Sequence, residues 1–145
     1  MNIKQLQMTV CKALIEGKRC GGCFINEREF AVTVDGFTAH CFSVVSCVFD
    51  IGKVEPFETL KPLFEDNDKD VELKQSKRLF YSNGDLLEKY VGESLEVYIR
   101  QDIAKTYKGF RFYANSPLGR VLVKDEVGRT VGLFLPVRFT EPTKE

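Results

Sequence analysis

The chain has 145 residues, 43% of them hydrophobic and 29% charged, which is the composition of an ordinary one-domain globular protein. Its 21 basic and 21 acidic residues cancel, which argues against a protein that coats nucleic acid through net positive charge. The sequence has no apolar run long enough to span a membrane, no signal peptide and an odd number of cysteines, so we expect a cytoplasmic protein with reduced thiols.

The first 50 residues predict a helix followed by antiparallel strands. Apolar residues recur at three- and four-residue spacing over residues 3–15, the pattern of an amphipathic helix. Residues 30–42 alternate around Asp35-Gly36, which is a strong hairpin signal because both residues tolerate positive φ. The apolar run over residues 44–49 predicts one more strand.

Residues 51–90 predict a polar connection between two halves of a single domain that covers residues 1–145. Two prolines interrupt this stretch, and the acidic run over residues 65–70 is too polar to bury. Asp85, followed three residues later by Glu88, fits a capping box and predicts a short helix through Tyr90.

The last third repeats the order of the first. Alternation over residues 95–99 predicts a strand, and Ile99, Ile103 and Tyr107 have the spacing of a helix that Gly109 ends. Three more strands are expected at residues 110–114, 120–124 and 131–139. The predicted fold class is α+β, with halves at about residues 1–50 and 91–139 that each consist of a helix and an antiparallel meander.

This order resembles one domain of the bacterial DNA sliding clamp, the ring-shaped processivity factor of the replicative polymerase. The similarity covers roughly two-thirds of the chain. Residues 97–104 resemble the family's strand and channel-lining helix, residues 116–123 its next hairpin strand, and residues 132–139 its closing strand. Residues 30–39 resemble the corresponding hairpin of the first half.

The resemblance implies a clamp-like fold with both helices on one face of the sheet, where cations bind DNA phosphates without reading bases. By position, these cations are Lys4, Lys12 and Arg19 on the first helix and Arg100, Lys105 and Lys108 on the second. Exposed helix faces are usually rich in Lys because of solvation alone, and the scarcity of acidic residues on these faces is the argument for DNA contact.

The implied function is a non-enzymatic, DNA-associated accessory or scaffold with double-stranded DNA and other protein chains as partners. Known clamps carry several such domains per chain, so a ring built from this one-domain chain requires a homo-oligomer. The alternative is a protein-interaction module that uses the same fold without DNA, through an edge strand or the polar connection.

A third function is a zinc or thiol module built on Cys20 and Cys23, which flank two glycines. His40, Cys41 and Cys47 could complete a zinc site, but neighbouring residues of a strand point to opposite faces, so His40 and Cys41 cannot both bind one ion without distortion. The cysteine pair follows a helix instead of preceding one, which argues against a redox dithiol.

Asp66, Asp68 and Asp70 imitate the start of a calcium-binding loop. Val71 and Lys77 stand where that loop requires Gly and Glu, so we expect a solvated acidic loop. The sequence also lacks a nucleophile elbow and a phosphate-binding glycine loop. We therefore expect no catalytic residue, no metal and no cofactor.

Overall fold

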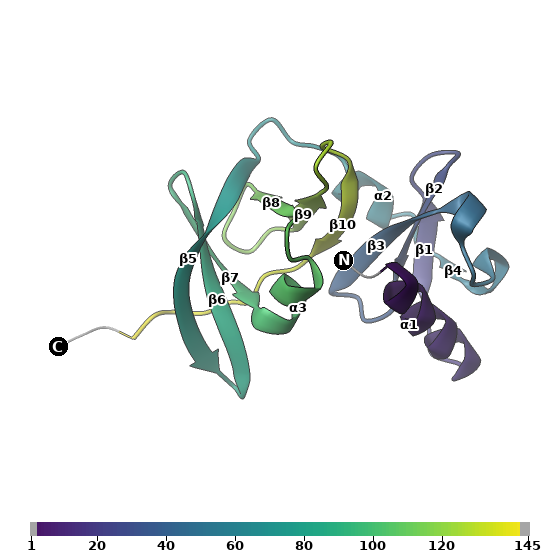
Figure 1. Ribbon diagram of the computed structural model, residues 1–145, viewed down its shortest axis with the longest axis horizontal. Helices are drawn as coiled ribbons and strands as arrows, with labels where there is room; N and C mark the ends of the chain where they lie inside the picture. The colour runs from purple at the N-terminus through teal and green to yellow at the C-terminus, as the bar shows by residue number, and fades with distance from the viewer. Residues whose placement is uncertain (1–2, 143–145) are drawn as a thin grey trace.

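The computed structural model describes residues 3–142. It is an α+β fold in which one sheet of ten strands has the order β4-β1-β2-β3-β10-β9-β8-β5-β6-β7 (Figure 1). Neighbouring strands are antiparallel except for the pair β1–β4. The elements in chain order are α1 (Ile3–Ile15), β1 (Gly21–Phe24), β2 (Glu29–Thr33), β3 (Thr38–Ser43), the 3-10 helices η1 (Val44–Ser46) and η2 (Ile51–Lys53), β4 (Glu55–Pro56), α2 (Leu60–Leu63), β5 (Val71–Ser82), β6 (Asp85–Gly92), β7 (Leu95–Arg100), α3 (Gln101–Thr106), β8 (Arg111–Ala114), β9 (Val121–Lys124) and β10 (Thr130–Phe134).

The first half confirms the predicted helix and hairpin. Val10 and Ala13 of α1 are buried against Phe30 and Val32 of β2, so the apolar stripe of the helix covers one face of the sheet. At the hairpin, the Asp35 carboxylate accepts hydrogen bonds from the backbone amides of Phe37 and Thr38, and Gly36 has a φ of 81°.

The strand predicted over residues 44–49 is wrong. These residues form η1 and a turn beside α1 because the buried Gln7 side chain binds their backbone. Gln7 Nε2 donates to the Ser46 carbonyl at 3.0 Å, and its Oε1 accepts from the Val48 amide at 2.6 Å. These two contacts satisfy backbone groups that a strand would have satisfied through a neighbouring strand.

The polar connection predicted over residues 51–90 is also wrong for most of its length, since it contains η2, β4, α2, β5 and most of β6. Leu60 and Phe64, in and after α2, are buried against Ala31 and Leu133 on the sheet face opposite α1. The expected solvated acidic loop is tied down in two places. Asp70 binds Arg120, whose Nη1 lies 2.9 Å from Oδ1. Asp66 Oδ1 lies 2.7 Å from Nζ of Lys124, at the end of β9.

The helix predicted from Asp85 to Tyr90 is a strand, because β6 pairs along its length with both β5 and β7. Asn83 and Gly84, with φ values of 51° and 83°, make the two-residue turn that joins β5 to β6. Pairing on both edges overrides the local capping pattern. The register of β5 shifts between Gln75 and Leu79, where Lys77 has a φ of 66°.

Strands β5 to β10 wrap around a second core. The buried side chains include Val97 and Ile99 of β7, Phe112 of β8 and Phe134 of β10. The strand expected to run through residue 139 ends at Phe134. Beyond Pro136, the Val137 amide donates to the Tyr98 carbonyl at 2.8 Å, so the chain leaves β3 and reaches the free edge of β7.

The last described residues hold this closure together. Phe139 packs on Phe80 and Tyr98, with ring centroids 5.2 and 5.1 Å apart. Glu141 accepts hydrogen bonds from Lys89 Nζ and the Tyr98 hydroxyl, each at 2.7 Å. These hydrogen bonds hold the pKa of Glu141 below its usual value.

Among residues 3–142, no helix has the length and hydropathy that a membrane crossing needs.

α1 and α3 lie on the same face of the sheet, and α2 lies on the other. Tyr107, at the end of α3, contacts His40 of β3 on the face that α1 covers, while Ala39 points toward α2. The central strands of the sheet have the order β1-β2-β3-β10-β9-β8. In chain order, α1 is followed by β1, β2 and β3 from one end of this row, and α3 is followed by β8, β9 and β10 from the other end. Helix-plus-meander units therefore meet at the β3–β10 pair, and β5, β6 and β7 extend the sheet beyond β8.

Candidate nucleic-acid interface

The predicted cations fall into two groups. Arg19, after α1, has Nε 3.5 Å from Glu55, and Lys12 lies 4.0 Å from Glu16, so both have carboxylate neighbours. Arg100 is bound by Asp102 at 2.9 Å, beside a small cavity between α1 and α3. The remaining residues, Lys4, Lys105 and Lys108, are exposed and form no ion pair within residues 3–142.

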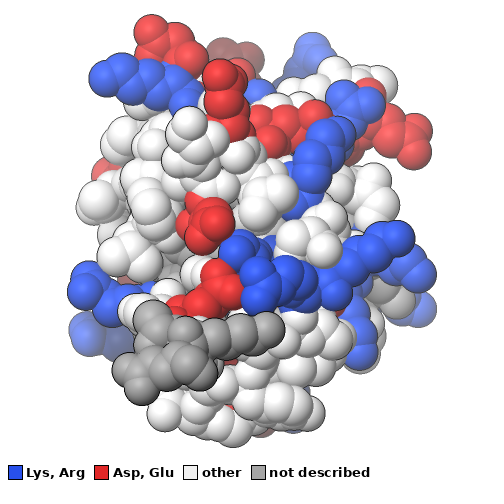
Figure 2. Space-filling model, turned by 90° about the vertical axis from the view of Figure 1, so that its left-hand side faces the viewer, with Lys and Arg blue, Asp and Glu red and all other residues white. Residues whose placement is uncertain are grey.

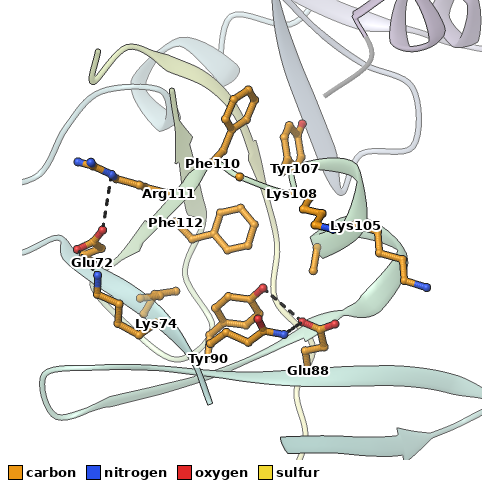
Figure 3. A pocket seen from close by; sticks show the side chains of 14 residues that line it. Glu72, Lys74, Glu88, Tyr90, Lys105, Tyr107, Lys108, Phe110, Arg111 and Phe112 are labelled. Atoms are coloured by element: carbon orange, nitrogen blue, oxygen red, sulfur yellow. Dashed lines mark hydrogen bonds and ion pairs between the residues drawn. The ribbon is translucent and has the colours of Figure 1, made fainter. Parts of the chain in front are cut away.

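Lys105 and Lys108 line the rim of a cleft of about 520 Å³ (Figure 3). The cleft exists because β5 and β8 pair only over residues 71–73 and 112–114. Beyond this short ladder, β5 continues along β6 while the chain before β8 turns back to α3. Residues from β5, β6, α3 and β8, which are distant in sequence, consequently surround one opening.

Opposite α3, the rim carries Lys74 and Arg111 (Figure 3). Glu72 lies between them, 3.1 Å from Lys74 Nζ and 3.9 Å from Arg111 Nε. Exposed pairs of this kind are weak and exchange readily with other anions. On the side of the molecule formed by β5 and β6, Lys and Arg form a band interrupted by Asp and Glu (Figure 2), so positive charge is local.

The floor of the cleft is aromatic and contains one buried carboxylate. Tyr90 and Phe112 have ring centroids 5.3 Å apart. Glu88 is 7% exposed, and its Oε2 accepts hydrogen bonds from Gln75 Nε2 at 2.9 Å and from the Tyr90 hydroxyl at 3.3 Å. Burial and the neighbouring carboxylate raise the pKa of Tyr90 to about 12, so its hydroxyl stays a donor at neutral pH.

The sequence indicated Lys105 and Lys108 but not the other side of this cleft. Lys74 lies in the predicted polar connection, and Glu88 lies in the predicted helix cap. The available signal was Asn83-Gly84, which marks a hairpin and would have aligned Glu88 and Tyr90 on one face of a strand.

His40 has a structural role in the fold. Its Nδ1 is hydrogen-bonded to the Tyr107 hydroxyl, between β3 and the end of α3. Burial, opposed by the charge of Asp35, lowers the pKa of His40 to about 4, so the ring is neutral near pH 7. Gly132 leaves room for this pair, since a Cβ there would lie 2.6 Å from the Tyr107 oxygen. The contact joins the two helix-plus-meander units.

The cysteines do not converge on a shared site. Cys20 is buried in the core under α1, whereas Cys23 is buried in the core under α2, on the other face of the sheet. Burial raises the pKa of both thiols, which disfavours the thiolate that zinc binding requires. All the cysteines are free, and residues 3–142 contain no cluster of three or more side chains suited to a metal. Cys20 and Cys23 therefore do not lie at one joint site.

Comparison with protein-family models, curated proteins and solved structures finds no match to this chain.

Proposed function

We propose that the protein is a non-enzymatic, cytoplasmic, DNA-associated accessory or scaffold that contacts the DNA backbone through cations on its helix side. The observation that carries this proposal is the pair Lys105 and Lys108. Both are exposed on α3 or directly after it, both lack a carboxylate partner within residues 3–142, and both border a cleft with Lys74 and Arg111 on its opposite rim. Such a group of cations suits phosphates, which require charge and no base-specific geometry.

The strand order supports a clamp-like fold as part of this proposal. Two helix-plus-meander units meet at β3 and β10 with α1 and α3 on one face, the arrangement that the resemblance implies. Lys4, Lys12 and Arg19 on the α1 side would extend the contact, with the carboxylate neighbours of Lys12 and Arg19 displaced by phosphate. Arg100 contributes less, because Asp102 neutralises it.

A ring in which copies pair edge to edge would use the two edge strands of the sheet, β4 and β7. β4 consists of Glu55 and Pro56, and the edge of β7 already receives a backbone hydrogen bond from Val137. Neither edge offers a long row of free backbone groups for a second copy. In the proposed function, DNA therefore contacts one face of the domain. A homo-oligomeric ring would need an interface other than these two sheet edges.

Fluorescence anisotropy with a labelled duplex, and with one of its strands alone, tests this function. We expect binding whose affinity falls steeply as salt rises from about 50 to 200 mM, because each bound phosphate releases counterions. Absence of binding to either DNA, or binding insensitive to salt, would contradict the proposal.

A further inference from the structure

The buried carboxylate of Glu88 is the least expected group in the cleft. It lies on the inward face of β6, in register with the apolar Ile99 of β7, and no cation pairs with it within residues 3–142. Both of its hydrogen bonds reach Oε2, while Oε1 has no hydrogen-bond partner within the same residues. Among residues 3–142, Arg100 Nε is the only buried side-chain nitrogen or oxygen without a hydrogen-bond partner, so Glu88 Oε1 keeps contact with solvent and is an acceptor that a ligand can reach.

Figure 3 shows this carboxylate beside Tyr90 in the floor of the cleft, with Lys105 and Lys108 on one side of the opening. Phe110 and Tyr90 are half-buried and offer ring surface to the cleft, and the volume of about 520 Å³ lies in the range of small-molecule sites. The site thus combines flat apolar walls, one free acceptor and cations at the rim.

A nucleobase on a phosphate backbone has the matching chemistry. Its flat ring packs against aromatic side chains, its amino group donates to a carboxylate, and the adjoining phosphates bind lysines. In a duplex the bases are stacked and paired, and taking one out costs a few kcal/mol, so a single-stranded segment presents a base to such a cleft most readily.

We propose that this cleft accepts one unstacked, amino-bearing nucleobase of a single strand, with Glu88 Oε1 as the acceptor and Lys105 and Lys108 on the adjoining phosphates. The inference rests on the proposed function and narrows it to single-stranded nucleic acid. Cytosine satisfies the site because its exocyclic amine donates. Uracil has the same ring size but presents a carbonyl oxygen at that position, which the carboxylate repels.

Anisotropy with labelled deoxycytidine and deoxyuridine 12-mers at equal salt tests this inference. We expect the deoxycytidine strand to bind roughly tenfold more tightly, the effect of one hydrogen bond to a charged acceptor. The mononucleotide dCMP should compete far more weakly than the strand, because it offers fewer phosphates.

The variant Glu88→Gln should abolish or reverse the preference, because Gln75 and Tyr90 both donate to one side-chain oxygen and therefore turn the new NH2 group, a donor suited to uracil, toward the base. Thermal melting checks that this isosteric variant folds. Glu126→Gln, which removes one negative charge from an exposed turn, should keep the preference.

Equal affinities of the wild-type protein for both strands, or an unchanged preference in folded Glu88→Gln, would overturn the inference and leave the proposed function intact. Equal affinities for dCMP and the strand would overturn the assignment to a strand. Failure of the wild-type protein to bind any DNA would overturn the proposed function and this inference together.

Discussion

Replacing Arg120 with Ala should lower the free energy of unfolding by about 3–5 kcal/mol. Arg120 holds Asp70 with two parallel hydrogen bonds, of 2.9 and 3.0 Å, and its Nε and Nη2 also donate to the carbonyls of Leu63 and Glu65. The side chains of Arg120 and Asp70 are only 11% and 9% exposed. The variant therefore leaves a buried carboxylate without its cation and releases the chain between α2 and β5.

Urea unfolding monitored by circular dichroism measures this loss. Lys18→Ala is the matched control, because Lys18 also pairs with a carboxylate, Glu16 at 3.2 Å, but on the exposed surface. Exposed pairs contribute about 0–1 kcal/mol, so Lys18→Ala should change stability little. Equal and small losses in both variants would contradict the structural role of the Arg120–Asp70 pair.

The same pair predicts a pH dependence. Burial alone would raise the pKa of Asp70, but hydrogen bonds from Arg120 and from the Asn67 backbone outweigh it and lower the pKa. A carboxyl group whose pKa is lower in the folded state stabilises the fold at pH values above its unfolded pKa, and that stability is lost as pH falls through the folded pKa. The difference in stability between wild type and Arg120→Ala should therefore shrink in acid.

Replacing Lys105 and Lys108 together with Glu should weaken DNA binding by about tenfold or more at 50 mM salt. The change removes two proposed phosphate contacts and adds repulsion, and the slope of log affinity against log salt should fall by about 2. Both side chains are exposed, so the fold should persist. Anisotropy across a salt series measures the affinity and the slope together.

The control for this variant carries the same charge change elsewhere. Lys61 and Lys69 are exposed and lie in or after α2, which covers the opposite face of the sheet. Replacing both with Glu should leave the slope unchanged apart from the small effect of net charge. Equal weakening by the two double variants would show that binding follows net charge and not the α3 surface.

The periodicity of apolar residues predicts the helices and strands whose burial follows a regular local pattern. The helix α1 and the strands β2, β3 and β7 appear where the spacing places them, whereas α3 spans only Gln101–Thr106, so it begins after Ile99 and ends before Gly109. Residues 44–49 could not be assigned locally, because Gln7 of α1 determines their path.

The longest strand was missed for a different reason. The register of β5 shifts between Gln75 and Leu79, and Leu73 is the only fully buried residue of this strand. Phe80 packs on Tyr98 and Phe139, on the face opposite Leu73. No alternation of useful length remains in the sequence.

The sequence predicts one half of the candidate site, because helical spacing links Lys105 and Lys108. Glu88 reaches them only through the non-local pairing of β6 with β7.

The most direct test of the central claim is a titration of isotope-labelled protein with a short single strand, followed by amide chemical shifts in nuclear magnetic resonance. We predict the largest, salt-sensitive shifts at Lys105, Lys108, Gly109 and Arg111, around the cleft between α3 and β8. Shifts concentrated on the α2 face, or no shifts at a saturating excess of DNA, would contradict the assignment of this surface to nucleic-acid binding.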